Sequence, residues 1–429
     1  MPRFFVQNFG CRATQADGAA LEAQLSSNGL ERTPDRTTAD FVILNTCTVT
    51  AAADEDVRQT VRRVRRENPG TRILVTGCYA QRAPDELAAL PGVEWVVGNS
   101  HKAGIADLLT AAPYHGQVLV GDIFACRDIL TAPVLDAALD RTRPNLKIQD
   151  GCNNRCSFCV IPFVRGRSRS SPAGLVVEQV RSLATRYREV VLSGINLGRW
   201  GREPGSTMRL AGLLRRLLAE TDIARLRLSS IEPMDLSDDL LGLMAESPRI
   251  AKHVHAPLQS GSDTILRRMH RKYRPRHYAD RILKARRLMP DAAIGADVMA
   301  GFPGETDTEF EENRSFIDSL PFTYLHVFTY SERPGTPAAT APRQVPMHVR
   351  KHRNRVLRDL STKKNLEFRR SMVGKKLSVL TLEEPGTALS DNYLRVELRE
   401  PRPAQQLFDL QIGAVTATAL QEADLFPIV

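Results

Sequence analysis

The fold is decided by the stretch Leu146-Lys147-Ile148-Gln149-Asp150-Gly151-Cys152-Asn153-Asn154-Arg155-Cys156-Ser157-Phe158-Cys159, in which a short apolar strand runs into a loop with three cysteines. From this point on, short apolar segments alternate with helical patterns, as in β/α units. The predicted strands are 146–149, 189–193, 225–229, 253–256, 292–298 and 324–328. Six units are fewer than the eight of a closed barrel, so the pattern predicts an incomplete (β/α)6 barrel.

The three cysteines of this loop predict a metal centre. Thiolates within eight residues can bind one face of a metal site, and soft sulfur ligands suit iron–sulfur clusters. A zinc site normally has a fourth Cys or His, and none lies near this loop. Three ligands on a four-iron cluster leave one iron open, facing the carboxyl edge where barrel active sites lie. The alternatives are a zinc knuckle and three buried free cysteines.

The N-terminal region carries a second set of cysteines. Predicted strands at 4–6, 41–44, 73–75 and 95–97 alternate with helices at 15–28 and 51–67, which indicates a doubly wound parallel sheet. Cys11, Cys47 and Cys78 each follow one of the first three strands. Strand ends of a parallel sheet converge at one edge, so we expect the three to meet. The alternative is unrelated buried cysteines, which is our interpretation of Cys126.

The length of 429 residues predicts two or three domains. A proline-containing stretch at 130–144 is interpreted as a linker. Short predicted strands at 379–382, 393–398 and 415–420 indicate a small C-terminal β-barrel. We therefore expect domains at 1–130, 140–370 and 371–429.

Composition points to the cytoplasm. The chain is 42% hydrophobic and 25% charged, as in soluble globular proteins. It has no apolar run near the roughly 20 residues needed to span a bilayer, and its start does not resemble a secretory signal. In a reducing compartment, seven cysteines are better explained as ligands than as disulfides. We expect a cytoplasmic protein with no membrane partner.

The charge distribution favours a polyanionic partner. The net charge is +10, and residues 343–376 hold twelve Lys or Arg against two acids. Residues 377–429 hold three Arg against eight acids. The basic segment also has apolar residues at helical spacing, so a solvated linker helix is an equal alternative to a nucleic-acid contact.

The spacing Cys-x3-Cys-x2-Cys, with Phe158 before the third cysteine, resembles the signature of the radical S-adenosylmethionine superfamily. The resemblance implies that the open iron chelates S-adenosylmethionine and that the reduced cluster cleaves it to a 5′-deoxyadenosyl radical. Residues 193–196, 229–233, 257–262 and 297–305 resemble the cofactor-contacting loops. The implied contacts are Phe158, Ser193, Gly194, Ile195, Asn196, Glu232, Gln259 and Asp297. The resemblance also implies Arg165 as a polar contact in the cleft and as a candidate catalytic residue.

The whole chain resembles the methylthiotransferases of this superfamily, which carry a terminal RNA-binding (TRAM-like) barrel. Residues 45–50, 75–81, 140–143, 146–152 and 390–393 are similar to the branch that modifies N6-threonylcarbamoyladenosine-37 of tRNA. The alternatives are modification of isopentenyladenosine, modification of a ribosomal-protein aspartate, and a non-catalytic iron–sulfur regulator that binds RNA. Two features depart from the family pattern. Three residues after Cys11, Thr14 stands where the family usually has Asn. The terminal barrel is short and acidic, which weakens its case as the main RNA-binding surface.

The resemblance implies two [4Fe-4S] clusters, one on Cys152, Cys156 and Cys159 and an auxiliary one on Cys11, Cys47 and Cys78. One S-adenosylmethionine would supply the methyl group and another the radical. Implied partners are tRNA, a sulfur source and an electron donor such as flavodoxin or ferredoxin. Candidate RNA contacts are Arg58, Arg62, Arg63, Arg350, Lys351, Arg353 and Arg355. His253 and His255, alternating on one strand, are interpreted as packing residues.

Overall fold

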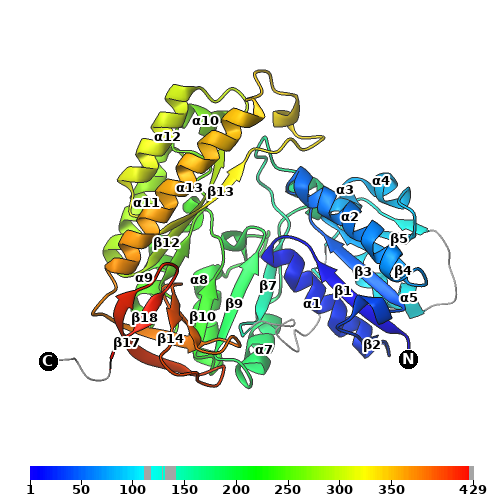
Figure 1. Ribbon diagram of the computed structural model, residues 1–429, viewed down its shortest axis with the longest axis horizontal. Helices are drawn as coiled ribbons and strands as arrows, with labels where there is room; N and C mark the ends of the chain where they lie inside the picture. Colours follow the sequence, from blue (N-terminus) through cyan, green and yellow to red (C-terminus); the bar gives the residue numbers. More distant parts are fainter. Residues whose placement is uncertain (111–116, 128, 131–141, 425–429) are drawn as a thin grey trace.

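The computed structural model describes residues 1–110, 117–127, 129–130 and 142–424. The chain forms an N-terminal parallel sheet, a central open barrel and a small closed C-terminal barrel (Figure 1). Most of the predicted linker 130–144 lies outside the described residues. Among those described, no helix is both long and apolar enough to cross a bilayer.

The N-terminal sheet has the parallel strand order β2-β1-β3-β4-β5-β6. Its elements are β1 (Arg3–Asn8), α1 (Arg12–Ser27), β2 (Glu31–Arg32), β3 (Phe41–Thr46), α2 (Ala51–Glu67), β4 (Arg72–Gly77), α3 (Cys78–Arg82), α4 (Pro84–Ala88), β5 (Val93–Gly98), α5 (Ile105–Thr110) and β6 (Gln117–Leu119). One apolar core packs α1 and α5 on the sheet, and a second packs α2, α3 and α4 on it. The predicted doubly wound fold is confirmed.

The central region contains the six predicted parallel strands, and their order confirms the partial barrel. Its elements are β7 (Asn145–Asp150), α6 (Ile161–Arg165), β8 (Arg169–Ser170), α7 (Ala173–Ala184), β9 (Glu189–Gly194), α8 (Leu210–Glu220), β10 (Arg225–Leu228), α9 (Asp238–Glu246), β11 (His253–His255), α10 (Asp263–Arg268), α11 (Pro275–Leu288), β12 (Ala293–Ala300), α12 (Asp307–Ser319), β13 (Tyr324–Thr329) and α13 (Met347–Arg370). The strands pair as β10-β9-β7-β8 and β11-β12-β13, and a single bridge, Leu226 to Ile250, joins the two groups. The short antiparallel β8 was not predicted.

The basic helix α13 packs along β13 instead of standing free as a linker (Figure 1). Two of its predicted RNA contacts, Arg350 and Arg353, are buried. Arg350 donates to the carbonyls of Val345 and Tyr330, and Arg353 pairs with Glu305 at 2.8 Å. Their prediction as RNA contacts is therefore wrong, because both guanidinium groups are used to hold the helix on the barrel.

The C-terminal region forms a closed five-stranded barrel of β14 (Lys376–Thr381), β15 (Thr387–Ser390), β16 (Arg395–Glu397), β17 (Leu407–Val415) and β18 (Leu420–Glu422). The barrel was predicted, but a single strand over 415–420 is wrong. A turn separates β17 from β18, closed by a hydrogen bond from the Thr416 N–H to the Ala419 carbonyl. The Thr416 hydroxyl also accepts from the Ala419 N–H, which stabilises the turn.

Glu189 joins the central barrel to the C-terminal barrel. This buried carboxylate accepts from Arg227 at 2.7 Å and from Arg143 at 3.2 Å. Arg227 in turn donates to the carbonyls of Ser390 and Asp391. Burial alone would raise the pKa of Glu189, but the arginine charges outweigh it and lower the pKa to about 2. The ion pairs therefore hold the two barrels together through a charged carboxylate.

Replacing Glu189 with glutamine should lower the free energy of unfolding at pH 7 by about 3 kcal/mol. A carboxyl with a depressed folded-state pKa stabilises the fold above its unfolded pKa, and this contribution is lost as the pH falls from 4.5 towards 2. The measurement is the free energy of unfolding of both proteins at neutral pH and at several pH values between 4.5 and 2. If the difference in unfolding free energy between the two proteins does not become smaller at acidic pH, this role for the Glu189 charge is contradicted.

Candidate active site

The loop of Cys152, Cys156 and Cys159 directly follows β7. Gly151 turns the chain at φ +70°, and a side chain there would collide with the backbone of Arg167. The Cys152 N–H donates to the Gly166 carbonyl at 3.1 Å, and the Cys159 N–H donates to the Cys156 carbonyl at 3.1 Å. These bonds fold the loop into a compact turn at the carboxyl end of the strand, as predicted.

Polar groups surround the sulfurs of this loop. Arg271 donates to the Cys156 sulfur at 3.2 Å and also pairs with Glu232. The Asn154 N–H lies 3.4 Å from the Cys152 sulfur. Burial and, to a smaller extent, the nearby Cys156 together raise the pKa of the Cys159 thiol to about 12. A thiolate at this position therefore needs a bound cation, and Arg271 supplies only part of the compensating charge.

The second cysteine set gathers at the carboxyl edge of the N-terminal sheet. Cys11 precedes α1, Cys47 follows β3, and Cys78 begins α3. Cys47 and Cys78 are buried, whereas Cys11 is exposed. Burial raises the pKa of Cys47 to about 12, and the neighbouring Cys78 and Cys11 add to the increase. The three thiols are thus close enough to interact, in line with the expectation from strand order. The Cys126 sulfur lies 3.7 Å from the Ser100 carbonyl oxygen.

Gly10 allows the Cys11 loop to approach Cys47. It has φ +91°, and a Cβ atom there would lie 2.5 Å from the Cys47 Cβ and 2.8 Å from its sulfur. Such contacts cannot occur without moving one cysteine loop away from the other.

Replacing Gly10 with alanine should therefore lower the iron bound at the Cys11, Cys47 and Cys78 set, with little effect on the other set. Gly29 is a matched control, because it has φ +84° but nothing within 4 Å of a new Cβ. Iron content per chain after anaerobic reconstitution is the measurement. Equal iron in the G10A and G29A variants would show that close approach at Gly10 is not required.

Arg165 couples the auxiliary set to the central barrel. It is buried, donates to the Cys78 sulfur at 3.3 Å, and pairs with Asp17 at 2.9 Å and Asp150 at 3.0 Å. Lys147 also pairs with both carboxylates, and Lys102 lies 3.1 Å from Asp17. The structure thus places Arg165 at the auxiliary cysteines, not among the predicted cofactor contacts.

The donor chemistry of both sets suits an iron–sulfur cluster. Each set offers three cysteine sulfurs, and soft thiolates suit such clusters, in which each cysteine binds a different iron. A structural zinc ion normally takes four ligands, and among the described residues no fourth Cys, His or carboxylate completes either set.

Buried polar atoms near the first set fit a polar cofactor. The Ser193 and Ser229 hydroxyls and the Asn196 carbonyl oxygen are buried and have no hydrogen-bond partner in the described chain. These residues lie at the ends of β9 and β10, and the Asn196 amide is 3.9 Å from the Cys152 sulfur. Buried polar atoms are normally paired, so a ligand with donors and acceptors would complete them.

A cavity of about 200 Å³ lies between the two cysteine loops. One wall carries Val49 and Thr50, immediately after Cys47, and another carries Phe158 and Cys159. The remaining wall comes from Ile161 and Val160 and from the ends of the barrel strands, with lining residues Gln259, Asp297, Met299, Phe328, Thr329, Ser331 and Arg333. Three of the predicted cofactor contacts, Phe158, Gln259 and Asp297, therefore share one cavity that is bordered by Cys159 and by Val49 and Thr50 of the Cys47 loop.

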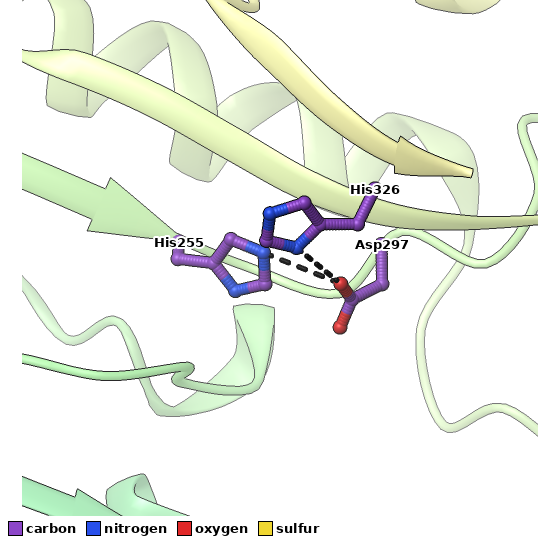
Figure 2. Close-up of side chains that lie close together, drawn as sticks. All are labelled: His255, Asp297 and His326. Atoms are coloured by element: carbon purple, nitrogen blue, oxygen red, sulfur yellow. Dashed lines mark hydrogen bonds and ion pairs between the residues drawn. The ribbon is translucent and has the colours of Figure 1, made fainter. Parts of the chain in front are cut away.

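Asp297 belongs to a cluster with two histidines at the edge of this cavity (Figure 2). Its Oδ1 lies 3.3 Å from His255 Nε2 and 3.2 Å from His326 Nδ1. Burial alone would raise the pKa of Asp297, but the close contacts with His255 and His326 outweigh it and hold the pKa well below its usual range. His255, interpreted from sequence as packing, thus lies at the site. His326 was missed, although polar residues alternating along a barrel strand were a usable signal.

His253 fits a packing role better. It is buried, bonds the Tyr324 hydroxyl at 2.7 Å and stacks on Tyr393 of the C-terminal barrel. Burial, followed by the charge of Arg227, lowers its pKa well below the usual value, which keeps it neutral.

The other predicted residues lie outside the cavity. Ser193, Gly194 and Ile195 end β9 or follow it, and Glu232 lies beside Arg271. Of the predicted RNA contacts, Arg62, Arg63, Lys351 and Arg355 are exposed, and Arg58 pairs with Glu55. Arg271 and Arg333 were not found from sequence, because no local motif marks either one.

Comparisons with known proteins agree with this geometry. Residues 3–98 match the uncharacterized protein family UPF0004, and residues 146–317 match the radical SAM superfamily. The fold resembles the radical S-adenosylmethionine methyltransferase TsrM from Kitasatospora setae, with a TM-score of 0.58 and 17% identity over 79% of this chain and 77% of that one.

Relatives with curated names are more similar. The threonylcarbamoyladenosine tRNA methylthiotransferase MtaB of Aquifex aeolicus is 37% identical over 91% of this chain and 95% of its own length. The MtaB of Bacillus subtilis is 38% identical over 90% and 88%. The tRNA-2-methylthio-N(6)-dimethylallyladenosine synthase of Thermobifida fusca is 34% identical over 89% and 78%. With this coverage and the cysteine geometry above, the chain belongs to the radical S-adenosylmethionine tRNA methylthiotransferase family.

Proposed function

We propose that this enzyme transfers a methylthio group to C2 of N6-threonylcarbamoyladenosine at position 37 of tRNA, with two [4Fe-4S] clusters and S-adenosylmethionine as cofactors. The observation that carries the proposal is the cavity bordered by both cysteine loops, since a transfer between two centres needs one shared space. The similarity to two proteins named MtaB supports the threonylcarbamoyl substrate.

In this proposal the two cysteine sets hold different centres. Cys152, Cys156 and Cys159 hold the radical cluster, and the auxiliary cluster is held by Cys11, Cys47 and Cys78. When bound, the radical cluster and S-adenosylmethionine supply the 5′-deoxyadenosyl radical that activates the adenine C2–H. Arg271 stabilises the thiolate of Cys156, and Arg165 does the same for Cys78.

The remaining residues bind and orient. Phe158, Gln259 and Asp297 line the cavity, while Ser193, Gly194, Ile195, Asn196 and Glu232 surround the cluster loop as cofactor contacts. The apolar walls exclude water, which protects a radical from side reactions. An electron donor such as flavodoxin or ferredoxin would reduce the clusters, and a separate sulfur source would replenish the transferred sulfur.

Three functional units share this work: residues 1–130 carry the auxiliary cluster, 140–370 the radical chemistry and 371–429 a TRAM-like RNA contact. The proposed contacts with tRNA phosphates are the exposed side chains of Arg62, Arg63, Lys351 and Arg355. Arg58 is a further proposed contact, although it is half-buried and pairs with Glu55. Tyr393 of the last unit accepts a hydrogen bond from Arg12, next to Cys11, at 3.3 Å. The terminal barrel therefore reaches the auxiliary site.

Mass spectrometry of digested tRNA from a strain lacking the gene tests the substrate. We expect loss of 2-methylthio-N6-threonylcarbamoyladenosine, with its precursor accumulating, and recovery on return of the wild-type gene. Loss of the isopentenyl derivative instead would assign the other tRNA branch. Unchanged levels of both nucleosides would exclude tRNA as the substrate and favour the ribosomal-protein alternative.

A further inference from the structure

Among the described residues that line the cavity between the two cysteine loops, Arg333 is the cationic one. It lies in the loop after β13, is only 5% exposed and lines the cavity together with Ser331. The loop docks on the N-terminal domain close to Cys47, because the Ala51 N–H donates to the Ser331 hydroxyl at 3.0 Å. Its position is therefore fixed relative to both cysteine loops.

Most of the Arg333 guanidinium has no partner. Nη2 pairs with Asp54 at 2.7 Å, but Nε and Nη1 are buried and make no hydrogen bond within the described chain. Buried charged donors without partners are costly, so they normally mark a missing ligand. The unused donors indicate that this side chain is completed by a group from outside the chain.

The ion pair with Asp54 does not satisfy all the hydrogen-bond donors of Arg333. The Asp54 carboxylate already accepts from Thr48 at 2.7 Å and pairs with Arg82 at 3.1 Å. Arg82 does not line the cavity. Arg82 also pairs with Glu86 at 3.7 Å, whereas Asp54 reaches Arg333 through Nη2 alone and leaves its Nε and Nη1 donors for a ligand in the cavity.

The cavity chemistry identifies the class of ligand. Its walls at Val49, Phe158, Met299 and Phe328 are apolar, which strengthens a charge interaction. The other charged lining residue among those described, Asp297, is already paired with two histidines. A guanidinium with free donors prefers an oxyanion such as a carboxylate or a phosphate.

We propose that Arg333 binds an anionic oxygen of the substrate nucleotide and so positions the base between the two cysteine sets. This inference rests on the proposed function, in which the substrate offers two such oxyanions. One is the carboxylate of the threonylcarbamoyl group, and the other is the phosphate of the same nucleotide.

The test compares R333K with the matched control R82K, because both keep a positive charge near Asp54 but only Arg333 lines the cavity. Each variant is reconstituted anaerobically, and its iron content is measured first. With tRNA carrying threonylcarbamoyladenosine, we expect kcat/KM of R333K to fall about 10- to 100-fold, the loss typical of a charged hydrogen bond. R82K should stay close to wild type. Formation of 5′-deoxyadenosine without tRNA should be unchanged in R333K.

A tRNA in which the threonylcarbamoyl carboxylate is a neutral methyl ester identifies the oxyanion. If Arg333 binds the carboxylate, the ester should slow the wild type as much as R333K, with no further loss in R333K. If it binds the phosphate, R333K should lower the rate equally with native and esterified tRNA. Both patterns support the proposal.

Three results would overturn it: equal kinetics of R333K and R82K, loss of iron in R333K with a proportional loss of rate, or slower S-adenosylmethionine cleavage without tRNA. The first two mean a structural role, and the third means that the cofactor carboxylate is the ligand. If the wild-type enzyme is inactive on this tRNA, the proposed function itself is refuted. That result is distinguishable from the three above, which all require an active wild type.

Discussion

Replacing Cys156 with alanine should abolish formation of 5′-deoxyadenosine and of the methylthiolated nucleoside. The Cys156 sulfur accepts a hydrogen bond from Arg271, and three cysteine ligands on a four-iron cluster hold the cluster and leave one iron open for S-adenosylmethionine. The C152A/C156A/C159A variant should lower iron from about eight to about four per chain, because each four-iron cluster is lost as a unit. Mass spectrometry of both products and iron analysis after anaerobic reconstitution are the measurements.

Two variants serve as controls for this result. Cys126 lies in neither set, so C126A should keep the iron and both products of the wild type. C47A should keep 5′-deoxyadenosine but lose methylthiolation, because it removes a ligand of the auxiliary set alone. Retention of 5′-deoxyadenosine by C156A, or loss of about four irons in C126A, would contradict the assignment of the radical cluster.

Replacing Arg165 with glutamine should lower the free energy of unfolding by about 3–5 kcal/mol, the usual effect of breaking a buried ion pair. Arg165 pairs with Asp17 of the N-terminal domain and with Asp150 of the barrel, and all three are buried. Hydrogen bonding to the Cys78 sulfur adds a second consequence. The auxiliary cluster should be lost at lower temperature than the radical cluster.

The measurement is thermal unfolding followed by iron release, with visible absorbance reporting the clusters. R215Q is the control, because the Arg215–Asp239 pair is largely exposed and should contribute little. If R165Q and R215Q unfold alike, Lys147 and Lys102 are sufficient to neutralise the two carboxylates. Loss of both clusters at one temperature would mean that Arg165 acts on overall stability only.

Local sequence patterns predict most of the helices and strands close to where the structure has them. Strands 146–149 and 189–193 were predicted close to β7 and β9, because buried apolar segments between turn residues leave few alternatives. The errors fall where local signals compete: a turn at Thr416 was included in a strand, and the two-residue β8 has too short a pattern to be found. α13 was recognised as a helix, but its buried arginines were interpreted as surface residues.

The two cysteine sets and their arginine partners differ in how well the sequence alone predicts that they lie together. The spacing of Cys152, Cys156 and Cys159 predicts one ligand loop without any tertiary information. Cys11, Cys47 and Cys78 could be grouped because parallel strands end at one edge of a sheet. The family resemblance predicts Arg165 as a contact in the cleft, and no pattern in the sequence indicates Arg271. Neither has a spacing relation to the sulfur it contacts.

The sequence by itself thus determined the fold class and the two cysteine sets, because strand periodicity and ligand spacing are properties of neighbouring residues. Only the tertiary structure decided that the Cys47 loop and the Cys159 loop border one cavity, that Asp54 and Arg333 meet across the domain interface, and that Asp297 lies between two histidines. These contacts join residues far apart in the chain. Their distances depend on how domains and strands pack, and no local pattern encodes that packing.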